Sequence, residues 1–176
     1  MNNREIEALQ FSGWPLPDTY LVEIGRVTVL WSSLEGFLNM CLGKLAGFNE
    51  HADPKPFILV THSSFPQRLD MLGALCEHLV PDFPHLADFK ATITALRTAQ
   101  RERNKWTHNG FGPGEVPGEV VMSSGSARGS VKTSVDTITV ADIRRAAIAI
   151  CEAMRVLYKL VLRRDLPAAP WQQTGQ

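Results

Sequence analysis

The chain of 176 residues contains little cysteine, and its three cysteines form no recognisable pattern. Cys41, Cys76 and Cys151 are odd in number and show no Cys-x-x-Cys spacing, which argues against a disulfide framework and against a zinc site. Each of them falls within an apolar helical pattern. We therefore expect three buried thiols in a reducing compartment.

The chain also lacks a net charge and a long apolar segment. Eighteen basic and eighteen acidic residues give a formal charge of zero, so the protein does not coat nucleic acid through its overall field, and any polyanion site must be local. No apolar run reaches the roughly 18 residues of a membrane span. The first residues, MNNREIEALQ, do not resemble a secretory signal. These absences predict a cytoplasmic protein without a membrane partner.

Apolar residues recur at helical spacing in four long segments. The first should run from Asp18, a suitable N-cap, to Gly47, a suitable C-terminal glycine. The others are expected at about 64–80, from about residue 84 to the motif described below, and at about 141–164. Because each apolar stripe must be covered by a neighbour, the sequence predicts an all-α fold, a bundle of four to five helices.

Residues 116–140 interrupt the helical pattern between the third and fourth long helices. They are rich in Gly, Ser, Thr and Val, and the runs EVVMS and SVKTSVDTITV flank the turn-forming GSARG. This pattern predicts a β-hairpin or ordered flap inserted into the bundle. Residues 1–165 should therefore form one helical domain, followed by a flexible tail at 166–176.

The third helical pattern ends in RNKWTH at 103–108, where its apolar face becomes polar. Arg103, Asn104 and His108 form an Arg-Asn-x-x-x-His motif, and Gly110 can stop the helix just beyond it. Histidine can transfer a proton near neutral pH, and arginine supplies permanently charged donors for a phosphate. These residue types suit metal-independent cleavage of RNA, in which the 2′-hydroxyl attacks the adjacent phosphate.

The stretch RNKWTH, followed by NG, resembles the Arg-polar-x-x-x-His motif of HEPN domains, small all-α proteins common in prokaryotic toxin and phage-defence systems. WSSLEGFL and SFPQRLDMLGAL precede the motif in an order similar to that family in outline. The resemblance implies an endoribonuclease that works as a homodimer, with the two motifs facing each other across a cleft. It also implies that Arg103 and His108 are the catalytic pair and that Asn104 supports them.

A toxin of this kind would have an antitoxin protein as a further partner. HEPN toxins that are paired with a nucleotidyltransferase antitoxin carry a modified tyrosine two residues after the histidine. Gly110 stands at that position here, so this form of regulation is not expected.

Regular helical geometry favours an assembly of two chains. Five residues along a helix turn by about 140°, so Arg103 and His108 of one chain should point in different directions, whereas Asn104 and His108 share a face. Two motifs around a twofold axis would place two arginines and two histidines around one cleft. We therefore expect a homodimer with the ends of both motif helices at or near the interface.

Four further residues are candidates for supporting roles. Glu35 lies at the border of the first apolar stripe and, if buried, would need Arg103 or Arg68 as a partner. The other three lie on the motif helix and could bind RNA phosphates, or simply form a solvated charged face: Arg97, Arg101 and Lys105. No set of His, Cys or carboxylate residues has metal-ligand spacing, so we expect no metal and no other cofactor.

Other interpretations of the same residues remain open. Cations and amides collect at helix C-termini because the exposed carbonyls favour them, so the motif could be a structural cap. A HEPN-like bundle could also bind RNA, a nucleotide or a protein without cleaving anything, or serve as a purely structural module. Trp31 and Trp106 follow the apolar spacing and are expected in the core rather than as platforms for stacked bases.

Overall fold

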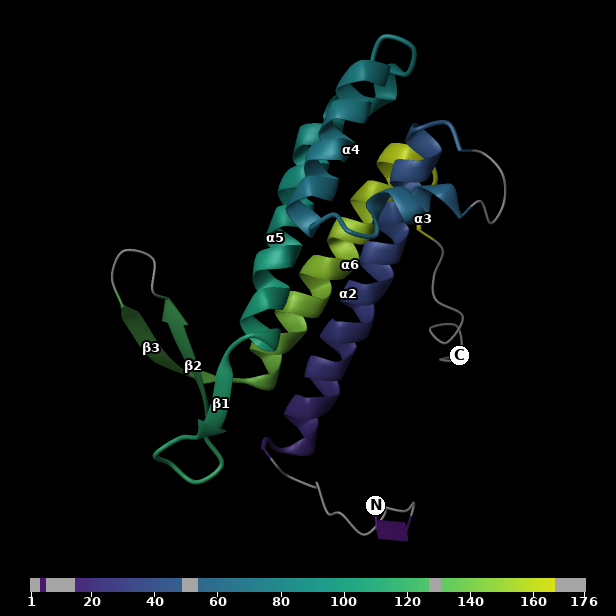
Figure 1. Ribbon diagram of the computed structural model, residues 1–176. Coiled ribbons are helices and arrows are strands. Elements are labelled where there is room, and N and C mark those ends of the chain that lie inside the picture. The colour runs from purple at the N-terminus through teal and green to yellow at the C-terminus, as the bar shows by residue number, and fades with distance from the viewer. Residues whose placement is uncertain (1–3, 6–14, 49–53, 127–130, 167–176) are drawn as a thin grey trace, which may run out of the picture.

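The computed structural model describes residues 4–5, 15–48, 54–126 and 131–166. In these residues the chain forms a helical bundle with a small antiparallel sheet at one end (Figure 1). The predicted tip of the hairpin at 127–130 and the tail at 167–176 lie outside them. None of the helices in the described segments is both long and apolar enough to span a membrane.

Four long helices make up the described bundle: α2 (Asp18–Leu45), α4 (Phe65–Leu79), α5 (Phe89–Thr107) and α6 (Val140–Leu162). α6 packs against both α2 and α5, and α4 contacts α2 and α5 (Figure 1). A short helix, α3 (Lys55–Val60), packs on α2, and a 3-10 helix, η1 (Pro84–Asp88), leads into α5. The predicted bundle of helices is therefore confirmed.

Capping boxes explain where two of the long helices begin. The Ser64 hydroxyl accepts the backbone N–H of Gln67, and the Gln67 side chain accepts the backbone N–H of Ser64. Thr139 and Asp142 form the same reciprocal pair before α6. Each box satisfies two backbone donors that the helix itself leaves free, so it determines the first residue of the helix.

α2 begins without a side-chain cap and ends before a glycine. Pro17 occupies the cap position, and Asp18, predicted as the cap, is the first helical residue instead. An acidic residue in the first turn is still favoured by the helix dipole. Gly47 follows the last turn with a φ of +87°, a conformation that glycine adopts without strain, and so ends the helix as predicted.

The hydrophobic core lies between α2, α4, α5 and α6, and it buries two of the three cysteine thiols. Its fully buried side chains recur at helical spacing and include Val27, Leu34, Leu38, Leu72, Leu96, Ile143, Ile150 and Leu157. Burial raises the pKa of the Cys41 thiol to about 12 and that of Cys76 to about 11. Cys151 is exposed, which corrects the prediction of three buried thiols: the neighbouring Ile150 takes the inward position on α6.

The sheet has the strand order β1 (Gly110–Pro113), β2 (Val120–Ser126), β3 (Lys132–Ile138), with both pairs antiparallel. β2 and β3 confirm the predicted hairpin. β1 is an additional strand that the sequence did not predict, because GFGP is short and rich in glycine and proline. Since β1 follows the motif directly, the sheet lies at the motif end of α5 (Figure 1).

Candidate functional site

Arg103 and His108 meet at the C-terminal end of α5. The helix ends at Thr107, and His108 is the residue after it, with φ −127° and ψ 0°. The Nε2 atom of the exposed His108 ring lies 3.1 Å from Nη1 of Arg103. Both side chains of the predicted catalytic pair therefore belong to one cluster within a single chain.

This contact corrects the expectation that the two side chains diverge. A turn of about 140° separates them only if His108 continues the helix with regular dihedrals. Because the helix has already ended, the backbone at His108 departs from helical geometry and its ring comes within hydrogen-bond reach of the long Arg103 side chain. A second chain is thus not needed to bring an arginine to a histidine.

Asn104 supports the pair through the same arginine nitrogen. Its Oδ1 accepts a hydrogen bond from Nη1 of Arg103 at 3.2 Å. Since a guanidinium can only donate, the contact is a hydrogen bond only in the tautomer of His108 whose Nε2 accepts and whose ring proton is on Nδ1. A neutral imidazole can take up a proton at Nε2 when that lone pair is released from Arg103.

The guanidinium of Arg103 is held from beneath by an aromatic ring of α2. Its Cζ lies 5.3 Å from the centroid of the Trp31 ring, a cation–π contact, and its Nε is buried with no hydrogen-bond partner in the described part of the chain. Trp31 is 4% exposed, which confirms its predicted place in the core, as does the same burial of Trp106. The contact with Arg103 gives Trp31 a second role that helical spacing does not indicate.

Glu35 pairs with Arg68 rather than with Arg103. Nη2 of Arg68 donates to Glu35, and Nη1 donates to Oδ1 of Asn39 at 2.9 Å. Arg68 is 8% exposed, so this carboxylate balances an almost buried charge. Of the two partners that the sequence left open, the structure selects Arg68, and no hydrogen bond or ion pair joins Glu35 to Arg103 or His108 in the described residues.

Aromatic side chains connect this ion pair to the motif. The guanidinium of Arg68 lies over the Phe65 ring, 5.7 Å from its centroid, and Phe65 packs against Trp31 with 4.6 Å between ring centroids. The stacked side chains thus run from Arg68 through Phe65 and Trp31 to Arg103, whose guanidinium lies over the Trp31 ring. Residues of α2, α4 and α5 thus fix the position of the arginine together.

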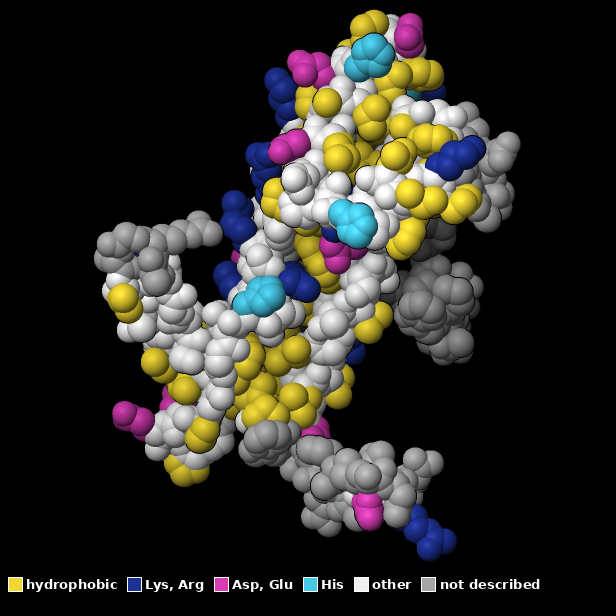
Figure 2. All heavy atoms as spheres, in the orientation of Figure 1, with side chains coloured by type: hydrophobic (Ala, Val, Ile, Leu, Met, Phe, Trp, Pro, Cys, Tyr) yellow, Lys and Arg dark blue, Asp and Glu magenta, His cyan; other side chains and the backbone are white. Residues whose placement is uncertain are grey.

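The three basic residues expected to bind phosphates carry weak local partners. Arg97 lies 3.6 Å from Asp70, with both side chains exposed, and Lys105 lies 2.9 Å from Glu102 in the same helix. Arg101 donates to the hydroxyl of Thr98 at 3.0 Å. Exposed pairs of this kind contribute little free energy, so a phosphate can replace them. Figure 2 shows Lys and Arg side chains in a row on this side of the bundle.

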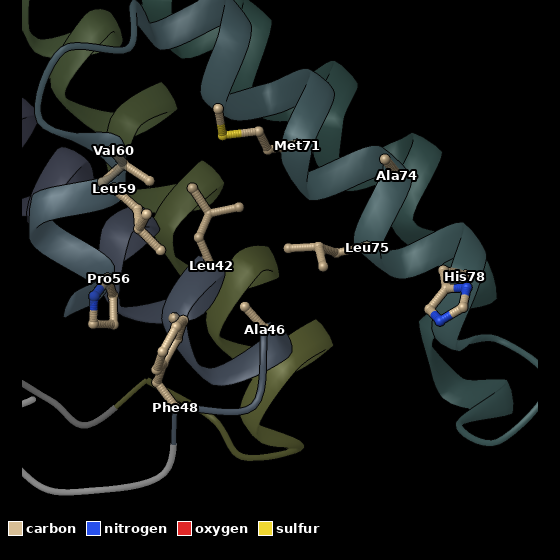
Figure 3. Close-up of a pocket in the computed structure, with 11 residues that line it drawn as sticks. Leu42, Ala46, Phe48, Pro56, Leu59, Val60, Met71, Ala74, Leu75 and His78 are labelled. Carbon is tan, nitrogen blue, oxygen red and sulfur yellow. The ribbon is translucent and has the colours of Figure 1, made fainter.

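A large apolar hollow lies elsewhere in the bundle, between α2, α3 and α4 (Figure 3). Its volume is about 500 Å³, and its lining includes Leu42, Leu59, Met71 and Leu75, with His78 as the ionisable side chain. Leu42 follows Trp31 by about 16 Å along α2, given a rise of 1.5 Å per residue. This hollow is therefore separate from the motif.

No three His, Cys, Asp or Glu side chains gather in the described segments as a group that could hold a metal ion. The chain has no significant match among protein-family models, curated proteins or solved structures. Its resemblance to HEPN domains accordingly rests on the motif RNKWTH and on the order of its helices.

Proposed function

We propose that this protein is a metal-independent endoribonuclease of HEPN type. The observation that carries the proposal is the 3.1 Å contact between Nη1 of Arg103 and Nε2 of His108 at an exposed helix end. An imidazole and a guanidinium in contact supply the two functions that RNA cleavage requires of a protein, which are proton transfer and stabilisation of negative charge.

In the contact between the two side chains Arg103 donates and His108 accepts, and this gives each side chain its own role in the proposed cleavage. Nε2 of His108 exchanges its contact with Arg103 for the ribose 2′-hydroxyl and accepts the proton of that hydroxyl, and the 2′-oxygen attacks the adjacent phosphorus. The bond from phosphorus to the 5′-oxygen breaks, the leaving oxygen takes a proton from water, and the hydroxide so formed takes back the proton from His108. The products are a 2′,3′-cyclic phosphate and a 5′-hydroxyl.

Arg103 keeps a donor available for the phosphate. Its Nη1 is shared between Asn104 and His108, whereas Nη2 bonds to no residue in the described part of the chain. A guanidinium held over Trp31 loses little further side-chain freedom when it binds. Its charge therefore meets the phosphate oxygens as they become more negative, without a large cost of reorganisation.

The resemblance adds a homodimer, an antitoxin partner and a role in toxin or phage-defence systems to the proposal. Since Arg103 and His108 already meet within one chain, the pair does not need a second copy for its completion. Dimer formation is therefore not what brings the two proposed catalytic side chains together.

A non-catalytic HEPN-like module that binds RNA, a nucleotide or a protein is the second candidate. The exposed basic residues of α5 favour it, because they can bind phosphates without any chemistry: Arg97, Arg101 and Lys105. An RNA-binding module and the proposed nuclease both predict binding of RNA that weakens as salt rises, so only the products distinguish these two.

Cleavage of total RNA and of a DNA strand by the purified protein tests the proposal. The 2′-hydroxyl is the nucleophile, so RNA should be cut to fragments with 2′,3′-cyclic phosphate ends, while the DNA strand stays intact even where it binds. RNA that is bound but never cut would favour the non-catalytic module. Cleavage of DNA, or RNA products without the cyclic phosphate, would rule out the proposed mechanism.

A further inference from the structure

β3 is the outermost strand of the sheet, and its outer edge faces no other element of the described chain (Figure 1). Its residues 132–137 are all exposed, and only Ile138 at its end is buried. Val135 is 67% exposed. An unpaired edge presents free backbone N–H and C=O groups, so it can accept a further strand.

The outer half of the β2–β3 ribbon has no core beneath it. The buried side chains of the two strands lie at the base of the ribbon, at Val120, Met122 and Ile138. From the pair Ser123–Val135 to the pair Ser126–Lys132, no residue is buried. A two-stranded ribbon without a packed face is only marginally stable in water, so this half gains stability from an additional strand.

The charges of β3 are complementary to those of a second β3 in antiparallel orientation. Around a twofold axis at Ser134, Lys132 of each copy lies opposite Asp136 of the other, and Thr133 lies opposite Val135. Within the described residues Lys132 forms no ion pair, and Asp136 accepts a hydrogen bond from the hydroxyl of Ser134 at 3.0 Å. Opposite charges and β-branched side chains directly across from each other stabilise strand pairs.

We propose that two copies of this chain pair through β3, antiparallel and about a twofold axis at Ser134, and so join their two sheets into one. Five strand spacings then separate the two β1 strands, about 24 Å, so each motif acts within its own chain. This interface differs from the meeting of α5 ends that the sequence predicted. The proposed β3 interface does not rest on the ribonuclease proposal, because its evidence comes only from the exposure, pairing edge and charges of β3.

Cross-linking of single cysteines locates the interface. Residues paired with themselves in antiparallel strands have Cα atoms about 4.5–5.5 Å apart, within the range of a disulfide. The exposed native thiol is first removed by Cys151→Ser. On that background Ser134→Cys should form a covalent dimer under mild oxidation, whereas Ser126→Cys, on the inner strand of the same ribbon, should not.

Two outcomes of the cross-linking would overturn the proposal. Equal cross-linking of Ser134→Cys and Ser126→Cys would indicate random collision instead of a defined interface. Cross-linking of Lys105→Cys in the last turn of α5, without cross-linking at Ser134→Cys, would show that the copies meet at their helix ends.

Charge reversal tests the pairing without a new thiol. Lys132→Glu places like charges opposite each other at both symmetric positions, so the dissociation constant measured by sedimentation should rise by about tenfold or more. The double variant Lys132→Glu with Asp136→Lys restores opposite charges and should restore the dimer. A wild-type protein that stays monomeric up to roughly 1 mM, or a Lys132→Glu variant that dimerises as well as wild type, would contradict the β3 interface.

Discussion

The guanidinium of Arg103 on α5 stands over the indole ring of Trp31 on α2, 5.3 Å from its centroid. The opposite end of the same aromatic series is Phe65, which packs against Trp31 at 4.6 Å. An arginine at an exposed helix end is thus held by residues of the core. The proposed phosphate contact is therefore positioned before the substrate arrives.

Replacement of Trp31 should affect cleavage beyond its effect on stability. Trp31→Leu removes the ring beneath Arg103, and loss of a cation–π contact of about 0.5–2 kcal/mol predicts a fall in kcat of roughly 2- to 30-fold, with a smaller fall for Trp31→Phe. Both variants should melt at lower temperature, because Trp31 is buried. Kinetics at a temperature where every variant is folded would measure this.

Phe65→Leu is the matched control for Trp31, since it removes a buried ring that does not contact Arg103. It should lower the melting temperature by a similar amount, but because Phe65 acts on Arg103 only through Trp31, the fall in kcat should be smaller than for Trp31→Leu. If Phe65→Leu and Trp31→Leu reduced kcat equally, Trp31 would have only a structural role.

Glu35→Gln should destabilise the fold without removing cleavage. The change leaves Arg68, 8% exposed, without its carboxylate partner. Because Glu35 is itself partly exposed, the expected loss is about 2 kcal/mol, or a fall of about 4–8 °C in melting temperature. Thermal melting and cleavage assays on the same sample would check both effects. Loss of cleavage at an unchanged melting temperature would place Glu35 in the catalytic site instead.

Glu23 provides a test that depends on pH. It accepts a hydrogen bond from Nε of Arg144 at 2.8 Å and pairs with Arg26. The hydrogen bond from Arg144, together with Arg26, outweighs the effect of burial and holds the pKa of Glu23 below its ordinary value of 4.5. A lowered pKa in the folded state stabilises the fold above the unfolded pKa, and this stabilisation disappears as pH falls through the folded pKa.

Wild type should therefore melt above Glu23→Gln at pH 7, and the difference should diminish below pH 4.5, the ordinary pKa of the carboxyl. Glu152→Gln is a suitable control, because Glu152 forms an exposed pair with Arg155 and should change the melting temperature little. A difference for Glu23→Gln that stays constant from pH 7 to about pH 2 would show that ionisation of Glu23 is not its source.

Cleavage of RNA should survive removal of divalent metal ions. The nucleophile is the 2′-hydroxyl of the substrate, and His108 and Arg103 supply proton transfer and charge. The rate in excess EDTA should stay within about twofold of the untreated rate. Activity that disappears in EDTA and returns with magnesium or manganese would mean that a metal ion takes part in the reaction.

Local signals in the sequence predicted the helices well. The apolar spacing of α2 acts within a few residues, so it can be recognised without knowledge of the fold. The capping boxes at Ser64 and Thr139 are equally local, but the predicted starts of these helices, at about 64 and 141, rested on apolar spacing and were not assigned to those caps. β1 was missed because four residues with two glycines and a proline have no strand preference of their own. Pairing with β2 supplies the hydrogen bonds that make it a strand.

The sequence singled out the three motif residues but did not predict how they contact one another. RNKWTH identified Arg103, Asn104 and His108, yet their contact depends on the end of α5 at Thr107, a detail that helical periodicity leaves undetermined. The contact of Arg103 with Trp31 joins two helices distant in sequence. Such a contact follows from packing and has no signal in either helix alone.

The rate of RNA cleavage by His108→Ala, measured beside its RNA affinity and melting temperature, tests the catalytic assignment most directly. Loss of the proposed base should lower the rate by about 100-fold or more. Because the exposed ring contributes little to the core, the melting temperature should change by only a few degrees, and RNA affinity should stay within about threefold. Arg103→Ala should weaken both binding and cleavage. A His108→Ala variant that cuts RNA as fast as wild type would contradict the assignment, and one that melts far below wild type would identify the motif as a structural cap.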